Sequence, residues 1–147
     1  MTKIEIPIEK LITAEDKFEA YKDEKIELIK NVGNIILTSG FPYDFGPPYG
    51  VQHLQLRDDT DRTNWLTAAQ GYQAQIALGN GDYPGATFRT AENNNITITF
   101  NQAYMVLMTM IGWGQHLFTV SWTKQDQVRA CTTKTEVDAI DPNEGWQ

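Results

Sequence analysis

The sequence contains very little cysteine and histidine. Cys131 is the only cysteine, so no disulfide can form within one chain, and a zinc site built from thiolates is excluded in practice. His53 and His116 are the only histidines, and a metal or nucleophilic site would need one of them beside a suitable partner. We therefore expect no metal, no cofactor and no catalytic residue. Cys131 is interpreted as a packed thiol and His116 as a surface residue.

Basic residues are also scarce. Twelve lysines and arginines stand against nineteen acids, which gives a formal net charge of -7. This charge repels a phosphate backbone and removes the main source of non-specific nucleic-acid affinity, so the sequence predicts no nucleic-acid partner. The acids at 58–61 lack the spacing and glycine of a calcium loop, and residues 79–82 lack the lysine of a phosphate loop.

A secretory signal and an uninterrupted membrane span are missing too. The first seven residues carry an acid and a proline where a signal peptide would need a basic patch and an apolar run, so we expect the chain to fold in a cytoplasm. The stretch from Ala103 to Trp122 would reach about 30 Å as a helix. Polar residues interrupt it, however: Thr109, Gln115, His116, Thr119 and Ser121. We interpret this stretch as a core helix and predict no membrane span.

The sequence has enough apolar residues for one folded domain. It is 147 residues long, with 41% apolar and 21% charged residues. Alternation of Ile4, Ile6 and Ile8 predicts an extended arm over 1–12, followed by a single domain over 13–147.

Turn and capping residues divide this domain into elements. We expect helices opened by Thr13, by Asp58, by Thr99 and by Thr133, where hydroxyl or carboxylate groups precede helical spacing. The first helix should end at Asn31, before Gly33 and Asn34. Strands are predicted at 35–37, 51–56, 87–89 and 96–98, with the first two pairing as a long-looped hairpin. The fold class is therefore α+β and mainly helical: one long central helix packed with two or three shorter helices and a small antiparallel sheet.

The central helix carries more apolar surface than one packing face requires. At about 100° per residue its apolar side chains form two adjacent stripes. The first stripe comprises Tyr104, Leu107, Met108, Ile111, Phe118 and Trp122, and the second comprises Ala103, Val106, Met110, Trp113, Leu117 and Val120. Gln115 interrupts the first stripe at its centre, so it needs buried partners or a wet interface. We expect one part of this surface to be covered by another subunit.

The segment 39–50 is rich in proline, glycine and aromatic residues. We predict a stiff loop that continues neither helix nor sheet. Rigid aromatic side chains suit binding because they bury much area at little entropic cost, although such a loop can also fold back on its own hairpin. The candidate interface residues are Phe41, Tyr43, Phe45, Tyr49, Trp113 and Gln115.

Five segments in the later two thirds of the chain resemble one known family. They are Gly50-Val-Gln-His-Leu-Gln, Arg57-Asp-Asp-Thr-Asp-Arg-Thr-Asn-Trp65, Phe88-Arg-Thr-Ala-Glu-Asn93, Thr133-Lys-Thr-Glu-Val-Asp-Ala-Ile-Asp141 and Gly145-Trp146. Together they are similar to an uncharacterised domain family of tailed bacteriophages and prophages, found in tail-fibre and tail-associated proteins. The resemblance covers residues 50–147. It departs where Gln147 stands in place of an expected proline, and we expect no fibre shaft before the domain.

The resemblance implies a virion protein of the tail, made in the host cytoplasm and without enzymatic activity. Our first hypothesis is a structural adaptor at the tail tip or fibre attachment point, which binds other tail proteins and forms a homo-oligomer within a symmetric assembly. The alternative is a fibre-assembly chaperone. A third hypothesis is a tail-associated protein that binds or cleaves glycan, although no pair of carboxylates in the sequence is singled out for cleavage.

Overall fold

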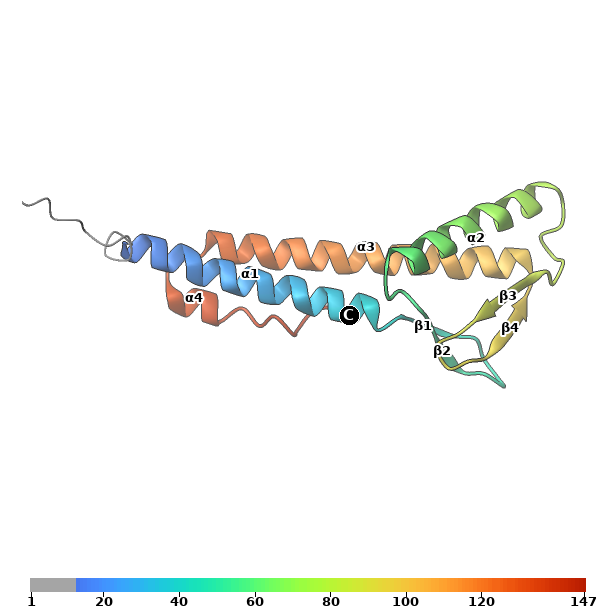
Figure 1. Cartoon of the computed structure of the whole chain (residues 1–147), viewed down its shortest axis with the longest axis horizontal. Coiled ribbons are helices and arrows are strands. Elements are labelled where there is room, and N and C mark those ends of the chain that lie inside the picture. The colour runs from blue at the N-terminus through green and yellow to red at the C-terminus, as the bar shows by residue number, and fades with distance from the viewer. Residues whose placement is uncertain (1–12) are drawn as a thin grey trace, which may run out of the picture. The chain divides into compact units, whose positions relative to one another are not determined.

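The computed structural model describes residues 13–147, and the predicted arm at 1–12 lies outside the described residues. Within residues 13–147, four helices and four short strands follow one another (Figure 1). The elements are α1 (Ala14–Thr38), β1 (Phe41–Asp44), β2 (Val51–Leu54), α2 (Asp59–Ala77), β3 (Ala86–Arg89), β4 (Asn95–Ile98), α3 (Phe100–Ala130) and α4 (Lys134–Asp138). The prediction of a mainly helical α+β fold with one long helix and small antiparallel pairs is confirmed.

The chain forms two compact units, and each is described by itself. Unit 1 contains the residues up to Gly33 together with 119–147, and unit 2 contains residues 34–118. The helices α1 and α3 contribute residues to both units.

The core of unit 1 is small and closed by the C-terminal tryptophan. Apolar side chains from α1, α3, α4 and the tail are buried in it: Ile26, Ile29, Val128, Val137 and Trp146. The indole N–H of Trp146 donates to the carbonyl of Pro142 at 2.8 Å, and the ring lies close beside residue 33. A Cβ on Gly33 would lie 3.0 Å from this ring, so the glycine allows α1 and the tail to approach closely.

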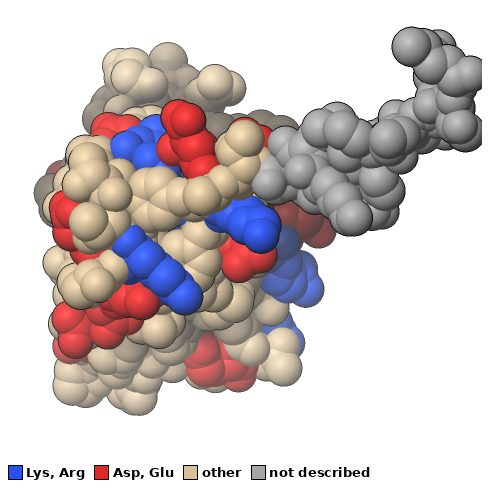
Figure 2. Space-filling model, turned by 90° about the vertical axis from the view of Figure 1, so that its left-hand side faces the viewer, with Lys and Arg blue, Asp and Glu red and all other residues tan. Residues whose placement is uncertain are grey.

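Three lysine side chains of unit 1 donate hydrogen bonds to backbone carbonyls of the same unit. The ammonium group of Lys22 is buried and donates to the carbonyls of Arg129 at 3.2 Å and Cys131 at 3.4 Å, at the end of α3. A cation is favourable there because the last carbonyls of a helix have no intrahelical partners. Lys25 and Lys124 likewise donate to carbonyls of the C-terminal segment, each at 2.8 Å. Figure 2 shows one face of the molecule, on which acidic and basic side chains lie next to one another.

Unit 2 contains two antiparallel hairpins. In the first, β1 pairs with β2 from Phe41 opposite Leu54 to Asp44 opposite Val51. In the second, β3 pairs with β4 from Ala86 opposite Ile98 to Arg89 opposite Asn95. The side chain of Gln52 joins the two because its Oε1 accepts bonds from Thr90 at 2.8 Å and from Asn94 at 3.0 Å.

The proline in β1 is tolerated because of its position in the ladder. Pro42 lies opposite His53, whose N–H donates to Glu92 and whose carbonyl accepts from Ala91. The backbone of His53 therefore points away from Pro42, and no ladder bond requires the N–H that proline lacks.

Aromatic rings fill much of the core of unit 2. Phe88 is fully buried and meets the rings of Phe45, Trp65 and Tyr72 at centroid distances of 6.3, 5.3 and 6.1 Å. The Trp65 and Phe45 contacts are edge-on, which is the favourable arrangement for ring pairs at this separation.

Two predicted features of the first third are wrong. Residues 35–37 do not form a strand, since α1 continues through them to Thr38. The turn residue is Gly40, with a φ of 100°, and Gly33 is accommodated inside the helix. Residues 41–44 belong to β1 and pair with β2, so this part of the predicted 39–50 loop is a strand.

The predicted helix starts are confirmed by their caps. Thr13 and Asp16 bond each other's backbone N–H groups at 3.1 Å, and Thr99 and Gln102 do the same at 3.0 and 3.1 Å. The carboxylate of Asp58 accepts from the N–H of Asp61 at 2.9 Å. These bonds satisfy backbone donors that have no partner within the helix. Within 13–147, no helix is long and apolar enough to cross a membrane.

Candidate functional site

The most unusual surface of unit 2 is an apolar stripe on α3. Met105, Met108, Ile111 and Phe118 lie on this helix with exposed fractions of 66, 37, 40 and 47%. From Met108 onward the positions 108, 111, 115 and 118 advance by three or four residues, so these side chains share one side of the helix. We call Met105, Met108, Ile111, Gln115 and Phe118 the α3 stripe.

The opposite side of the same helix segment is buried. It contributes Ala103, Val106, Leu107, Met110 and Leu117 to the core of unit 2. The second predicted stripe is therefore largely internal, with Trp113 half-buried in it, whereas the first stripe is exposed apart from Leu107 and the half-buried Tyr104. One stripe therefore packs within the chain and the other faces outward.

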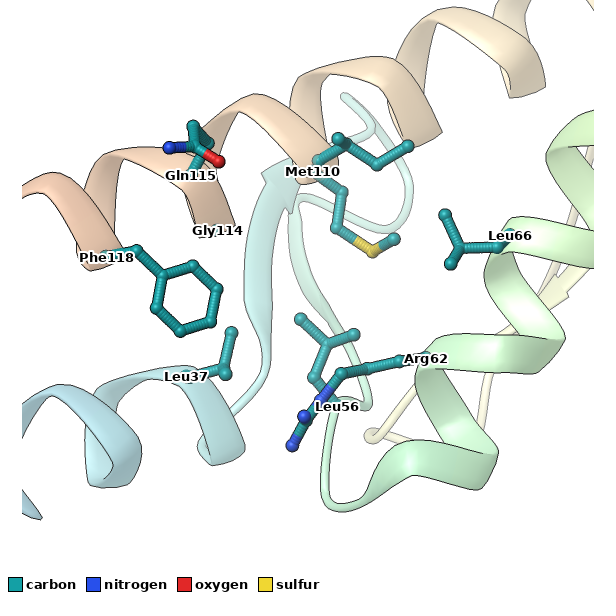
Figure 3. A pocket seen from close by; sticks show the side chains of 9 residues that line it. Leu37, Leu56, Arg62, Leu66, Met110, Gly114, Gln115 and Phe118 are labelled. Carbon is teal, nitrogen blue, oxygen red and sulfur yellow. The ribbon is translucent and has the colours of Figure 1, made fainter.

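An apolar hollow lies beside the α3 stripe (Figure 3). Its volume is about 250 Å³, and it is lined by Leu37, Leu56, Arg62, Leu66, Met110, Ile111, Gly114, Gln115 and Phe118. These residues come from the last turn of α1, the segment after β2, α2 and α3. The hollow and the α3 stripe form one continuous surface because they share Ile111, Gln115 and Phe118.

Arg62 is the one charged side chain that lines this hollow. Its Nη1 donates to Asp59 at 3.0 Å, but its Nε is buried and has no hydrogen-bond acceptor among residues 13–147. Figure 3 shows the guanidinium extending from α2 toward Leu56. A buried donor without an acceptor is energetically unfavourable, so a partner that supplies an acceptor to this Nε would be stabilised by the bond.

The candidate interface residues fall into two groups. Phe41, Tyr43, Phe45 and Trp113 are joined by ring contacts, with centroid distances from 4.8 to 6.1 Å, and Phe41 is buried. Tyr49 is exposed and donates from its hydroxyl to the carbonyl of Asn95 at 3.3 Å. Of the six, only Gln115 lines the hollow.

Sequence reasoning missed the α2 side of this surface. Leu66 is exposed and lies off the apolar face defined by Trp65, Ala69 and Tyr72. A leucine placed next to that face was the available signal. Leu66 lines the hollow because of the way α2 packs beside α3 within unit 2, and this packing cannot be predicted from the spacing of residues along one helix.

The described side chains offer little for covalent or metal chemistry. His53 contacts Glu92 with 3.3 Å between Nδ1 and Oε2, and His116 is exposed. Cys131 is buried and donates from its thiol to the carbonyl of Gln127 at 3.2 Å. Among residues 13–147 no group of three histidine, cysteine or acidic residues is placed to hold a metal ion. What the α3 stripe and the hollow provide is a surface for packing.

Comparison with known proteins gives one family. Residues 20–141 match the profile of a family described as a domain of unknown function, DUF4376. Searches of curated proteins and of solved structures give no match.

Proposed function

The chain belongs to the DUF4376 family, and from that premise we propose that it is a structural component of a bacteriophage tail that acts by docking onto other proteins. The proposed place is the tail tip or the attachment point of a tail fibre. Two observations support this role: the resemblance of residues 50–147 to phage tail-associated domains, and the α3 stripe. The α3 stripe carries the docking part, because exposed contiguous apolar surface of this kind marks interaction sites.

The proposed occupant of the α3 stripe is the same stripe of a second copy. The protein has a formal net charge of -7, so two copies repel each other over most of their surfaces. Residues 100–123 contain no lysine, arginine, aspartate or glutamate. Two copies can therefore meet along this helix without opposing like charges.

The spacing of the α3 stripe also suits a helical partner. Positions 108, 111, 115 and 118 repeat with the alternating steps of a coiled-coil seam. A polar residue at one such position fixes register at some cost in stability, and Gln115 occupies the centre of the α3 stripe. Identical helices can bury the same patch on both sides, which is the arrangement of a two-fold symmetric contact.

Self-association tests the docking part directly. Ile111→Lys places a charge in the α3 stripe, and Leu78→Lys places one on an equally apolar exposed residue of unit 2 outside it. In sedimentation equilibrium we expect the wild type and Leu78→Lys to associate, and Ile111→Lys to associate at least about tenfold more weakly, since an unpaired buried charge opposes the contact. A wild type that stays monomeric, or an Ile111→Lys variant that associates equally well, contradicts the proposed contact.

The place in the virion needs a separate experiment. Mass spectrometry of particles purified from the phage or prophage that encodes this chain should find the protein at a copy number that matches the symmetry of the tail. Its presence only in lysates with unassembled fibres, and never in particles, would support the alternative role of a fibre-assembly chaperone.

A further inference from the structure

A second hollow in unit 2 differs in character from the apolar one. Its volume is about 270 Å³, and it lies where one side of α2 meets β3 and the segment after β2. Asp61, Asn64, Trp65 and Tyr72 come from α2, and the last three follow Asp61 by three, four and eleven residues, which places all four on one side of the helix. Arg89 from β3 and Gln55 from the segment after β2 complete its polar lining.

The aromatic floor of this hollow is held in place. The indole N–H of Trp65 donates to the backbone carbonyl of Gln55 at 2.8 Å, and its ring meets the buried ring of Phe88 edge-on. Tyr72 packs against Phe88 and Phe100 with centroid distances of 6.1 and 5.8 Å. A ligand would therefore find these rings already oriented, which lowers the entropic cost of binding.

The one carboxylate that lines the hollow, Asp61, is already paired with Arg57. Both carboxylate oxygens of Asp61 accept bonds from Arg57, from Nε at 2.8 Å, Nη2 at 3.1 Å and the backbone N–H at 2.9 Å. The guanidinium of Arg89 donates from Nη1 to the Asn95 side chain at 3.1 Å. The lining therefore offers no unpaired carboxylate to a cationic ligand.

Neutral polar groups remain available. Among the described residues, the side-chain amides of Gln55 and Asn64 and the hydroxyl of Tyr72 make no hydrogen bond. Each amide presents both a donor and an acceptor, and a hydroxyl does the same. Paired donor and acceptor groups of this kind match the vicinal hydroxyls of a sugar, which also donate and accept.

We infer that this hollow binds one residue of a neutral saccharide, with the apolar face of its ring against Trp65 and its hydroxyls bonded to Gln55 and Asn64. The volume suits a single ring, because it lies just below the range of about 300–1,000 Å³ that drug-sized ligands occupy. This inference is independent of the proposed docking role, since none of the α3 stripe residues lines this hollow.

The test uses the full chain and a panel of four sugars: glucose, galactose, N-acetylglucosamine and glucuronic acid. Two-dimensional NMR of the labelled protein follows the indole signal of Trp65 and the side-chain amide signals of Gln55 and Asn64. We expect at least one neutral sugar to shift these signals with a dissociation constant on the order of 1 mM, as suits a ligand of few atoms.

Matched variants locate the site. Asn64→Ala combined with Gln55→Ala should weaken sugar binding at least about tenfold while leaving the thermal midpoint unchanged, because neither amide bonds to the protein. Gln70→Ala removes an exposed amide from the opposite side of α2 and should leave binding unchanged.

Three results would overturn the inference. They are the absence of any shift with all the neutral sugars, equal binding by the double variant and the wild type, and binding of glucuronic acid alone. The last would make Arg89 the recognising group.

Discussion

The carboxylate of Asp61 connects the start of α2 to the segment that precedes it. It receives three hydrogen bonds from Arg57 and also lies in the first turn of α2, where a negative charge is favourable. The side-chain bonds from Arg57 are the main cause of the lowered pKa of Asp61. A carboxyl group whose pKa is lower in the folded state stabilises the fold above its unfolded pKa, and this contribution is lost as the pH falls through the folded value.

Asp61→Asn should therefore change how stability depends on pH. At neutral pH we expect the free energy of unfolding to fall by about 0.2–1 kcal/mol, the range for exposed ion pairs. The difference from the wild type should shrink below about pH 4, the unfolded pKa of aspartate, because both proteins then lack the charge. Urea unfolding at several pH values measures this, and Arg57→Gln should give a similar profile. Parallel profiles for wild type and Asp61→Asn would show that the pair does not contribute.

Helix ends decide how well elements can be predicted from this sequence. The starts of α2, α3 and α4 are determined by local residues, since the side chains of Asp58, Thr99 and Thr133 each accept a bond from the backbone N–H three residues ahead. The end of α1 is not determined by local residues. Gly33 and Asn34 look like a helix stop, but α1 continues through them to Thr38, and the lack of a side chain at Gly33 leaves space for the Trp146 ring.

The misassigned hairpin has a similar explanation. The β-branched pair Ile35 and Ile36 favours a strand by propensity, yet Leu37 is buried as part of the last turn of α1. Pro42 argued against a strand at 41–44, and the ladder accepts it only because His53 turns its backbone groups toward Ala91 and Glu92. The candidate site is harder to predict from the sequence than the fold, because the hollow is formed by four segments that have no regular spacing along the chain.

Asp58→Ala tests the local rule on α2. Loss of the bond from the Asp61 N–H should lower the free energy of unfolding by about 1 kcal/mol. Thr63→Ala is the control, because Thr63 is exposed and its side chain makes no hydrogen bond among residues 13–147. Urea denaturation compares the two. Equal stability of both variants would mean that the bonds between Arg57 and Asp61 fix the start of α2 without this cap.

At the scale of the whole molecule, the two compact units suggest separate local stabilities. Unit 1 depends strongly on Trp146, which is buried against Gly33. Trp146→Ala should cost about 3 kcal/mol, since a large cavity would replace the ring. Hydrogen exchange should quicken most in α4 and in residues 14–33, and less in the hairpins of unit 2.

The control for this prediction lies in the same unit. Leu28 is exposed on α1, so Leu28→Ala should change exchange rates little. If Trp146→Ala speeds exchange equally in unit 1 and unit 2, the two units open together and the separation into local stabilities is incorrect.

The lone thiol of unit 1 makes these opening events measurable in the natural sequence. Cys131 is buried just after α3, where its carbonyl also accepts a bond from Lys22. A thiol reagent can reach the sulfur only when this part of the protein opens, and no second cysteine contributes signal. The rate at which Cys131 of the unmodified protein is labelled therefore reports the opening of unit 1, and no probe has to be engineered.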